Sequence, residues 1–145
     1  MFDSKLVLGN VHDNPQCVNY RIFKKSLHLE KYLLYLPKKH RIRICKFRCE
    51  NNRLPIVTGR YTHVERQNRL CNLCKSQLIG DEFHYLFVCP AFSTERKLYL
   101  NRYFTMRPNT FKMEELFNST NLCTRLKLAK YCQIIMLRFW DCGEI

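Results

Sequence analysis

Two short stretches decide how we expect this chain to fold: CNLC at residues 71–74 and GDEFHYLFVCP at residues 80–90. The first holds two thiols three positions apart, and the second holds a histidine and a cysteine five positions apart. Three thiolates and one imidazole complete a tetrahedron around Zn²⁺ and leave no open position, which is the mark of a structural ion. We therefore predict one structural zinc ion, held by Cys71, Cys74, His84 and Cys89.

The last pair of ligands requires an irregular backbone. On an ideal helix, positions five apart differ by about 140° in direction, so His84 and Cys89 can face one ion only if the helix is distorted. Pro90 provides a break at this point. The alternative is a set of buried thiols and a surface imidazole without a metal, and the close spacing of the four residues argues against it.

The other cysteines have a different interpretation. Cys45 and Cys49 lie four positions apart and are a weaker candidate for a second metal site, because both fall on an apolar stripe where cysteine behaves as a small core residue. The same interpretation applies to Cys123 and Cys132. The odd total of nine cysteines and an N-terminus without a signal-peptide pattern indicate a soluble, intracellular protein in a reducing compartment.

Positive charge is concentrated in one part of the chain. The formal net charge is +13 at pH 7, and residues 20–48 contain ten basic residues and one acid. Such a field attracts polyanions, so nucleic acid is the first partner to consider, ahead of an anionic membrane surface or a merely solubilising role. The residues predicted to contact RNA or DNA, mainly through phosphates, are Lys38, Lys39, Arg41, Arg43, Lys46, Arg48, Arg60, Tyr61, Arg66 and Arg69. Tyr61 is also available to stack on a base.

Apolar periodicity predicts a mainly α fold with little or no β-sheet, in which helical layers surround a small zinc knuckle. The predicted helices cover residues 20–36, 38–51, a segment after 93, 111–117 and a last helix of about 121–141. Ile42, Cys45 and Cys49 form the expected apolar stripe of the second helix. No apolar run approaches the roughly 18 residues of a membrane span.

The chain divides into four parts: a loosely ordered tail (1–19), a basic helical segment (20–57), a zinc-binding knuckle (58–92) and C-terminal helices (93–145). We expect residues 20–145 to form one compact unit. The last helix is apolar on nearly all sides from Ile134 to Trp140, so we expect this segment to be buried or to dock on a protein partner.

The run KFRCENNRLPIVTGRY at residues 46–61, the two stretches quoted above and Arg96 together resemble a known family. The chain is similar, from about residue 15 to residue 138, to the region downstream of the reverse transcriptase in non-LTR (LINE-type) retrotransposons of animals. The resemblance implies a zinc-binding segment that helps to hold template RNA or target DNA, with Cys71, Cys74, His84 and Cys89 as its ligands. It also implies a detached tail of such an element.

The sequence does not predict an enzyme. A polymerase of this kind needs paired aspartates to hold two metal ions, and the four aspartates here are never adjacent: Asp3, Asp13, Asp81 and Asp141. We expect a zinc-stabilised nucleic-acid-binding module without polymerase or nuclease activity. The alternative is a structural or protein-interaction module whose segment Ile134–Trp140 docks on a partner.

Overall fold

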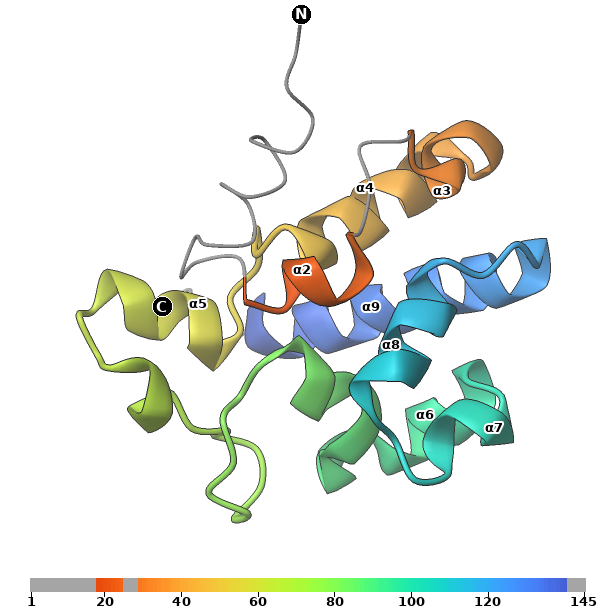
Figure 1. Ribbon diagram of the computed structural model, residues 1–145. Coiled ribbons are helices and arrows are strands. Elements are labelled where there is room, and N and C mark those ends of the chain that lie inside the picture. The colour runs from red at the N-terminus through yellow and green to blue at the C-terminus, as the bar shows by residue number, and fades with distance from the viewer. Residues whose placement is uncertain (1–17, 25–28, 141–145) are drawn as a thin grey trace, which may run out of the picture.

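The computed structural model describes residues 18–24 and 29–140, and this part of the chain is mainly α, as predicted (Figure 1). Its only strand-like pairing is an isolated antiparallel bridge between Leu70 and Ile79. The α-helices are α2 (Tyr20–Phe23), α3 (Lys31–Tyr35), α4 (Lys38–Arg48), α5 (Pro55–Tyr61), α6 (Ser93–Tyr99), α7 (Arg102–Thr105), α8 (Thr110–Phe117) and α9 (Leu122–Trp140). Two short 3₁₀ helices are η2 (Arg66–Asn68) and η4 (Pro90–Phe92), and η3 (His84–Val88) is a π-helix.

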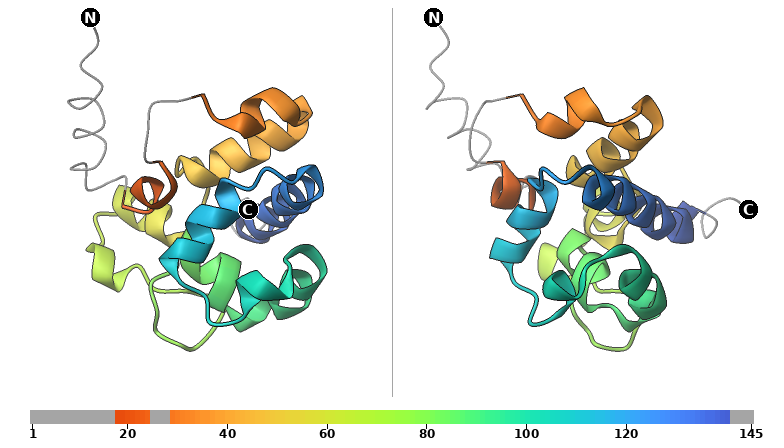
Figure 2. Two further views of the ribbon diagram at one scale, coloured as in Figure 1. Left: turned by 45° about the vertical axis from the view of Figure 1, so that its right-hand side comes forward. Right: turned by 90° about the vertical axis from the view of Figure 1, so that its right-hand side faces the viewer.

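The long helix α9 is the centre of the fold. It packs against α4 on one side and α6 on the other, while α2 packs against α8 (Figures 1 and 2). Asn121 starts α9 as predicted, because its side-chain oxygen accepts a hydrogen bond of 3.0 Å from the backbone N–H of Thr124. The shorter helices α4 and α6 thus form layers on two sides of α9.

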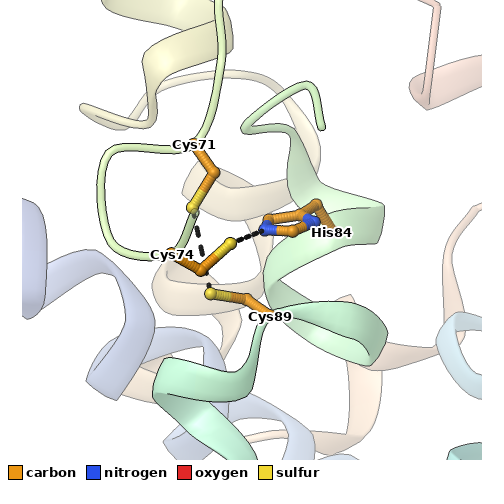
Figure 3. Close-up of side chains that lie close together, drawn as sticks. All are labelled: Cys71, Cys74, His84 and Cys89. Atoms are coloured by element: carbon orange, nitrogen blue, oxygen red, sulfur yellow. Dashed lines mark hydrogen bonds between the residues drawn. The ribbon is translucent and has the colours of Figure 1, made fainter. Parts of the chain in front are cut away.

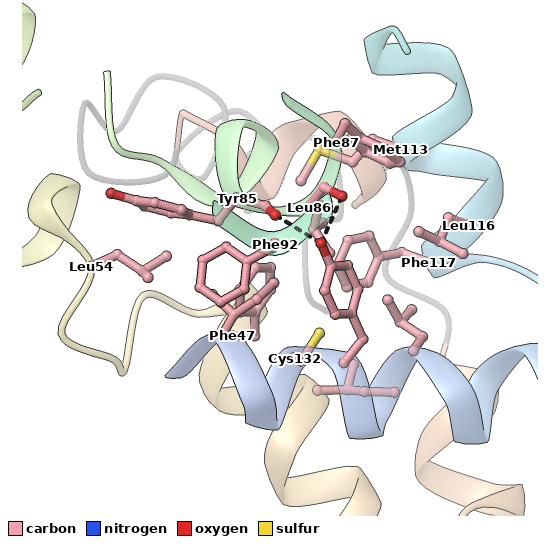
Figure 4. Close-up of a cluster of buried hydrophobic side chains, with 14 of the residues drawn as sticks. Phe47, Leu54, Tyr85, Leu86, Phe87, Phe92, Met113, Leu116, Phe117 and Cys132 are labelled. Atoms are coloured by element: carbon pink, nitrogen blue, oxygen red, sulfur yellow. Dashed lines mark hydrogen bonds between the residues drawn. The ribbon is translucent and has the colours of Figure 1, made fainter. Parts of the chain in front are cut away.

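One continuous core joins these layers (Figure 4). Phe47 of α4, Phe117 of α8 and Ile135 of α9 are buried in it. Tyr85 and Leu86 of η3 are also fully buried there. Each such side chain contributes roughly 1.5–3 kcal/mol when it is removed from water. Because η3 belongs to this core, the backbone that carries His84 and Cys89 is held from several sides.

The buried face of α4 differs from the predicted stripe. Ile42, Cys45 and Cys49 are exposed, whereas Ile44 and Phe47 face the core. Packing against α9 explains the difference, since an isoleucine and a phenylalanine bury more apolar surface than two cysteines. The helix forms as predicted, but it is rotated so that the predicted core stripe faces solvent.

The predicted helix over residues 20–36 is wrong in extent. The described residues form two short helices, α2 and α3, with Leu29 exposed before α3 and Leu36 buried after it. Pro37 separates α3 from α4, as expected from its missing N–H. Short helices of four or five residues depend on tertiary contacts, which the apolar periodicity does not reveal.

The segment Ile134–Trp140 is divided between the core and the surface. Ile135 and Phe139 are buried, while Leu137 and Trp140 remain exposed. One face of this segment is thus covered by the chain's own core. No helix in residues 18–24 or 29–140 is both long and apolar enough to cross a membrane.

The expected boundaries fit the elements unevenly. The boundary after residue 57 falls inside α5, and the boundary after residue 92 falls between η4 and α6. Most of the tail predicted at residues 1–19 lies outside the described residues. The contacts of α9 with both α4 and α6 join the predicted basic segment to the C-terminal helices.

Candidate metal centre and basic face

Residues 69–80 form a short antiparallel turn that carries Cys71 and Cys74. The N–H of Cys71 donates to the carbonyl of Leu78 at 2.8 Å, and the N–H of Gly80 donates to the carbonyl of Arg69 at 2.9 Å. Gly80 must lack a side chain, because a Cβ there would lie 2.7 Å from Tyr85 Oη. The end of the turn is therefore pressed against the helix that carries the other two ligands.

The π-helix η3 brings His84 and Cys89 to the same side of the backbone, although they are five positions apart. The N–H of Cys89 donates to the carbonyl of His84 at 2.7 Å, which is the i→i+5 hydrogen bond of a π-helix. This wider turn brings residues five apart onto one side. The predicted distortion is present, and it is a π-turn that ends where Cys89 adopts an extended backbone before Pro90.

The four predicted ligands converge on one point (Figure 3). Their ligand atoms all lie within 4.8 Å of one another. The Sγ atoms of Cys71 and Cys89 are 3.9 Å apart, and Cys74 Sγ is 3.4 Å from His84 Nε2. A tetrahedral zinc ion would require about 3.8 Å between two sulfurs and about 3.6 Å between sulfur and nitrogen. The group can hold a metal ion.

The surroundings affect the donor atoms unequally, since burial raises the pKa of Cys89 to about 12. The N–H of Leu73 donates to Cys71 Sγ at 3.4 Å, and the Ser76 hydroxyl lies 3.0 Å from Cys74 Sγ. Burial raises the pKa of Cys74, but hydrogen bonds from Ser76, Cys71 and Cys89 outweigh it and hold that pKa below its usual value. Burial lowers the pKa of His84, which favours the neutral imidazole that metals bind.

Two distant side chains stabilise the π-turn. The guanidinium of Arg96 donates to the carbonyls of Leu86 at 2.8 Å and Cys89 at 2.7 Å. The Tyr131 hydroxyl lies 3.0 Å from the carbonyl oxygen of Tyr85 and 3.2 Å from that of Leu86. Buried carbonyls need such partners. Arg96 and Tyr131 therefore hold in place the segment that presents His84 and Cys89.

The remaining described cysteines do not extend the metal centre. Among the described residues, only Cys71, Cys74, His84 and Cys89 form a group of three or more possible ligands. The core role predicted for the other cysteines is confirmed for Cys132, which is fully buried. It is wrong for Cys45, Cys49 and Cys123, which are exposed.

The basic residues predicted on α4 divide into two groups. Lys38, Lys39 and Lys46 are exposed, and Arg43 is partly exposed. Arg41 already forms a hydrogen bond within the chain, in which its guanidinium donates to the carbonyl of Leu33 at 2.7 Å. The three lysines are accessible to a phosphate. Arg43 is partly accessible and also contacts His40 Nδ1 at 3.3 Å, whereas Arg41 holds α3 against α4.

Sequence reasoning missed one member of this surface, Lys130 of α9. His40 of α4 is buried, and its pKa is lowered first by burial and then by the charges of Arg43, Lys39 and Lys130. Arg43 Nη1 lies 3.3 Å from His40 Nδ1, and Lys130 comes from α9, which packs against α4. We call Lys39, Arg43, Lys46 and Lys130 the basic face. Only the packing of α4 on α9 reveals it.

Arg48 does not belong to this surface, contrary to the prediction. It is 2% exposed and forms an ion pair of 3.2 Å with Glu30. Its guanidinium also lies over the rings of Tyr32 and Phe117, at 5.1 and 5.8 Å from their centroids. Arg48 thus joins α4 to the segment before α3 and to α8, and it is not accessible to a phosphate.

The predicted contacts beside the knuckle meet at another surface. Arg60, Arg66 and Arg69 line one pocket of about 280 Å³ together with Glu50. Arg60 pairs with Glu50 at 2.8 Å, and Arg69 donates to the carbonyls of Ile56 and Val64. Much of this charge is therefore already engaged within the chain. Tyr61 remains 72% exposed, as stacking requires.

Comparison with protein-family models, with curated proteins and with solved structures gives no significant match for this chain.

Proposed function

We propose that this chain is a zinc-stabilised nucleic-acid-binding module whose basic face contacts phosphates. The observation that carries the proposal is that α4, which bears Lys39, Arg43 and Lys46 at helical spacing, packs against α9, which bears the exposed Lys130. Cations clustered on one rigid surface attract a polyanion more strongly than the same charges scattered over the molecule. A retrotransposon-like origin is part of the same proposal and rests on the sequence resemblance.

Zinc is the metal that we assign to the four-ligand group. Thiolate and imidazole donors in a tetrahedral arrangement favour Zn²⁺ over the hard cations Mg²⁺ and Ca²⁺. Four protein ligands would leave no coordination position for a substrate, so we infer a structural ion rather than a catalytic one. The ion would join the turn at residues 69–80 to η3, and through η3 to the core.

A salt titration tests the proposal. If the four cations of the basic face each neutralise a phosphate, log affinity for a single strand should fall with log salt concentration with a slope of about −3. The Lys39/Arg43/Lys46→Ala variant should bind less tightly and lose about 2 from that slope. Fluorescence anisotropy of a labelled oligonucleotide measures both quantities.

A matched control removes equal charge elsewhere. Lys97, Arg102 and Arg107 are exposed on or next to α6 and α7, on the other side of α9 from α4. Their combined replacement by alanine should leave the slope nearly unchanged. Equal losses in the two triple variants would show only a dependence on net charge, and affinity insensitive to salt would exclude phosphate contacts.

A second candidate function is protein interaction at the exposed part of Ile134–Trp140. The exposed side chains of Leu137 and Trp140 favour it, because an apolar surface of this kind is a common docking site. Sedimentation at several concentrations, with and without the variant Leu137→Lys, separates this candidate from nucleic-acid binding.

A further inference from the structure

A groove lies beside the basic face. It is formed by the C-terminal end of α4, the following loop, α5 and the C-terminal end of α9, and it has a volume of about 560 Å³. This volume is within the range of ligand sites, roughly 300–1,000 Å³. Lys46 belongs both to the groove and to the basic face, so the two surfaces are continuous.

Two exposed aromatic rings line the groove, each with a guanidinium over it. Trp140 is 49% exposed, and the guanidinium carbon of Arg53 lies 4.3 Å from its ring centroid. Tyr61 is 72% exposed, and the corresponding distance from Arg60 is 5.2 Å. These cations help to hold the rings in place, while large parts of the rings stay accessible to a planar ligand.

The charge of the groove favours an anionic occupant. Lys46 and Arg53 are its basic residues, and its acid, Glu50, is paired with Arg60 at 2.8 Å. Accessible rings beside such cations match a base and its phosphate, because every base has a face that stacks. A protein helix would satisfy the apolar residues of the groove, but it would leave these cations without anions.

We propose that the groove takes unpaired bases of a single-stranded nucleic acid whose phosphates run along the basic face. This inference rests on the proposed function and adds a preference to it. In a duplex the bases are stacked on one another and are not available to Trp140 and Tyr61, whereas a single strand can turn them outward. The chain should therefore prefer single strands to duplexes.

Trp140 reports directly on this contact, because it is the only tryptophan in the chain. The zinc-loaded protein is titrated with a single-stranded oligonucleotide, with its duplex and with an abasic strand of the same length. We expect the single strand alone to quench tryptophan fluorescence strongly and to bind about tenfold more tightly than the abasic strand, since stacking contributes about 1–3 kcal/mol per base. The same titration with DNA and RNA strands of equal length and base sequence shows which of the two binds more tightly.

Substitutions localise the effect. Trp140→Leu should weaken single-strand binding about tenfold and leave abasic binding unchanged. Tyr61→Ala should act in the same direction, and Tyr61 is exposed enough for the fold to tolerate the change. Phe111→Leu is the control, because Phe111 is an exposed aromatic residue on α8.

The outcomes separate the inference from the function on which it rests. Equal affinity for normal and abasic strands, without quenching, would overturn the groove assignment and leave salt-dependent binding intact. Absence of binding to every strand at low salt would overturn both. Self-association that Trp140→Leu abolishes, without quenching by oligonucleotides, would assign the groove to a second copy of the chain.

Discussion

The guanidinium of Arg96 donates a hydrogen bond of 2.7 Å to the carbonyl oxygen of Cys89, the last residue of the candidate metal centre. A zinc ion with three thiolates and one neutral imidazole carries a net charge of about −1. Arg96 is therefore placed to fix the backbone of a ligand and to offset the charge of the loaded centre. Its position is a supporting contact of the kind that tunes metal affinity.

We expect Arg96→Gln to lower zinc affinity by about 10–100-fold, because supporting contacts of metal ligands have effects of this size. Competition with a chromophoric chelator measures the affinity. Arg102→Gln, at an exposed residue on α7, is the control and should bind zinc like the unmodified chain. If the two variants hold zinc equally well, Arg96 does not support the centre.

Tyr131→Phe should destabilise the zinc-loaded protein by about 1–2 kcal/mol. The change removes a buried hydroxyl that serves the carbonyls of Tyr85 and Leu86, and buried carbonyls that lose a partner are costly. Urea denaturation gives the free energy of unfolding. Tyr103→Phe removes an exposed hydroxyl hydrogen-bonded to Glu115 and should change it by less than about 0.5 kcal/mol. Similar values for the two variants would contradict the role given to Tyr131.

Arg48 and Lys39 should behave oppositely when they are replaced. Arg48→Gln should reduce stability by roughly 3 kcal/mol, because it breaks a largely buried ion pair and leaves Glu30 without that partner. Lys39→Ala should weaken oligonucleotide binding and leave thermal unfolding unchanged. If Arg48→Gln instead binds oligonucleotides less tightly and keeps its normal stability, Arg48 contacts the nucleic acid.

His40 should link both stability and binding to pH. Burial and then the neighbouring cations lower its pKa, so below the ordinary value of about 6.5 the unfolded chain binds protons more readily than the folded one. Stability should therefore decrease as the pH falls through this range. A bound polyanion would neutralise Lys39, Arg43 and Lys130 and raise the pKa of His40. NMR titration of the His40 ring with and without an oligonucleotide measures the shift, and an unchanged pKa would place the polyanion elsewhere.

The grouping of Cys71, Cys74, His84 and Cys89 was predictable because their spacing is local. The prediction also required a distortion between His84 and Cys89, but it did not identify a π-turn. That turn depends on Arg96 and Tyr131, and Tyr131 lies more than forty residues from the carbonyls it serves. No local pattern predicts the contact from Tyr131.

The basic face was only partly predictable for a similar reason. The charge of α4 is evident in the sequence, but the helix's orientation is decided by packing of Ile44 and Phe47 in the core. That orientation leaves Lys39 and Lys46 exposed and buries Arg48. Lys130 joins the face only because α9 lies against α4.

X-ray absorption spectroscopy of the purified protein, together with its metal content, tests the central claim most directly. We predict one zinc ion per chain, with three sulfur atoms at about 2.3 Å and one nitrogen atom at about 2.0 Å. A chain that folds without zinc, or a zinc ion surrounded only by oxygen and nitrogen, would contradict the account.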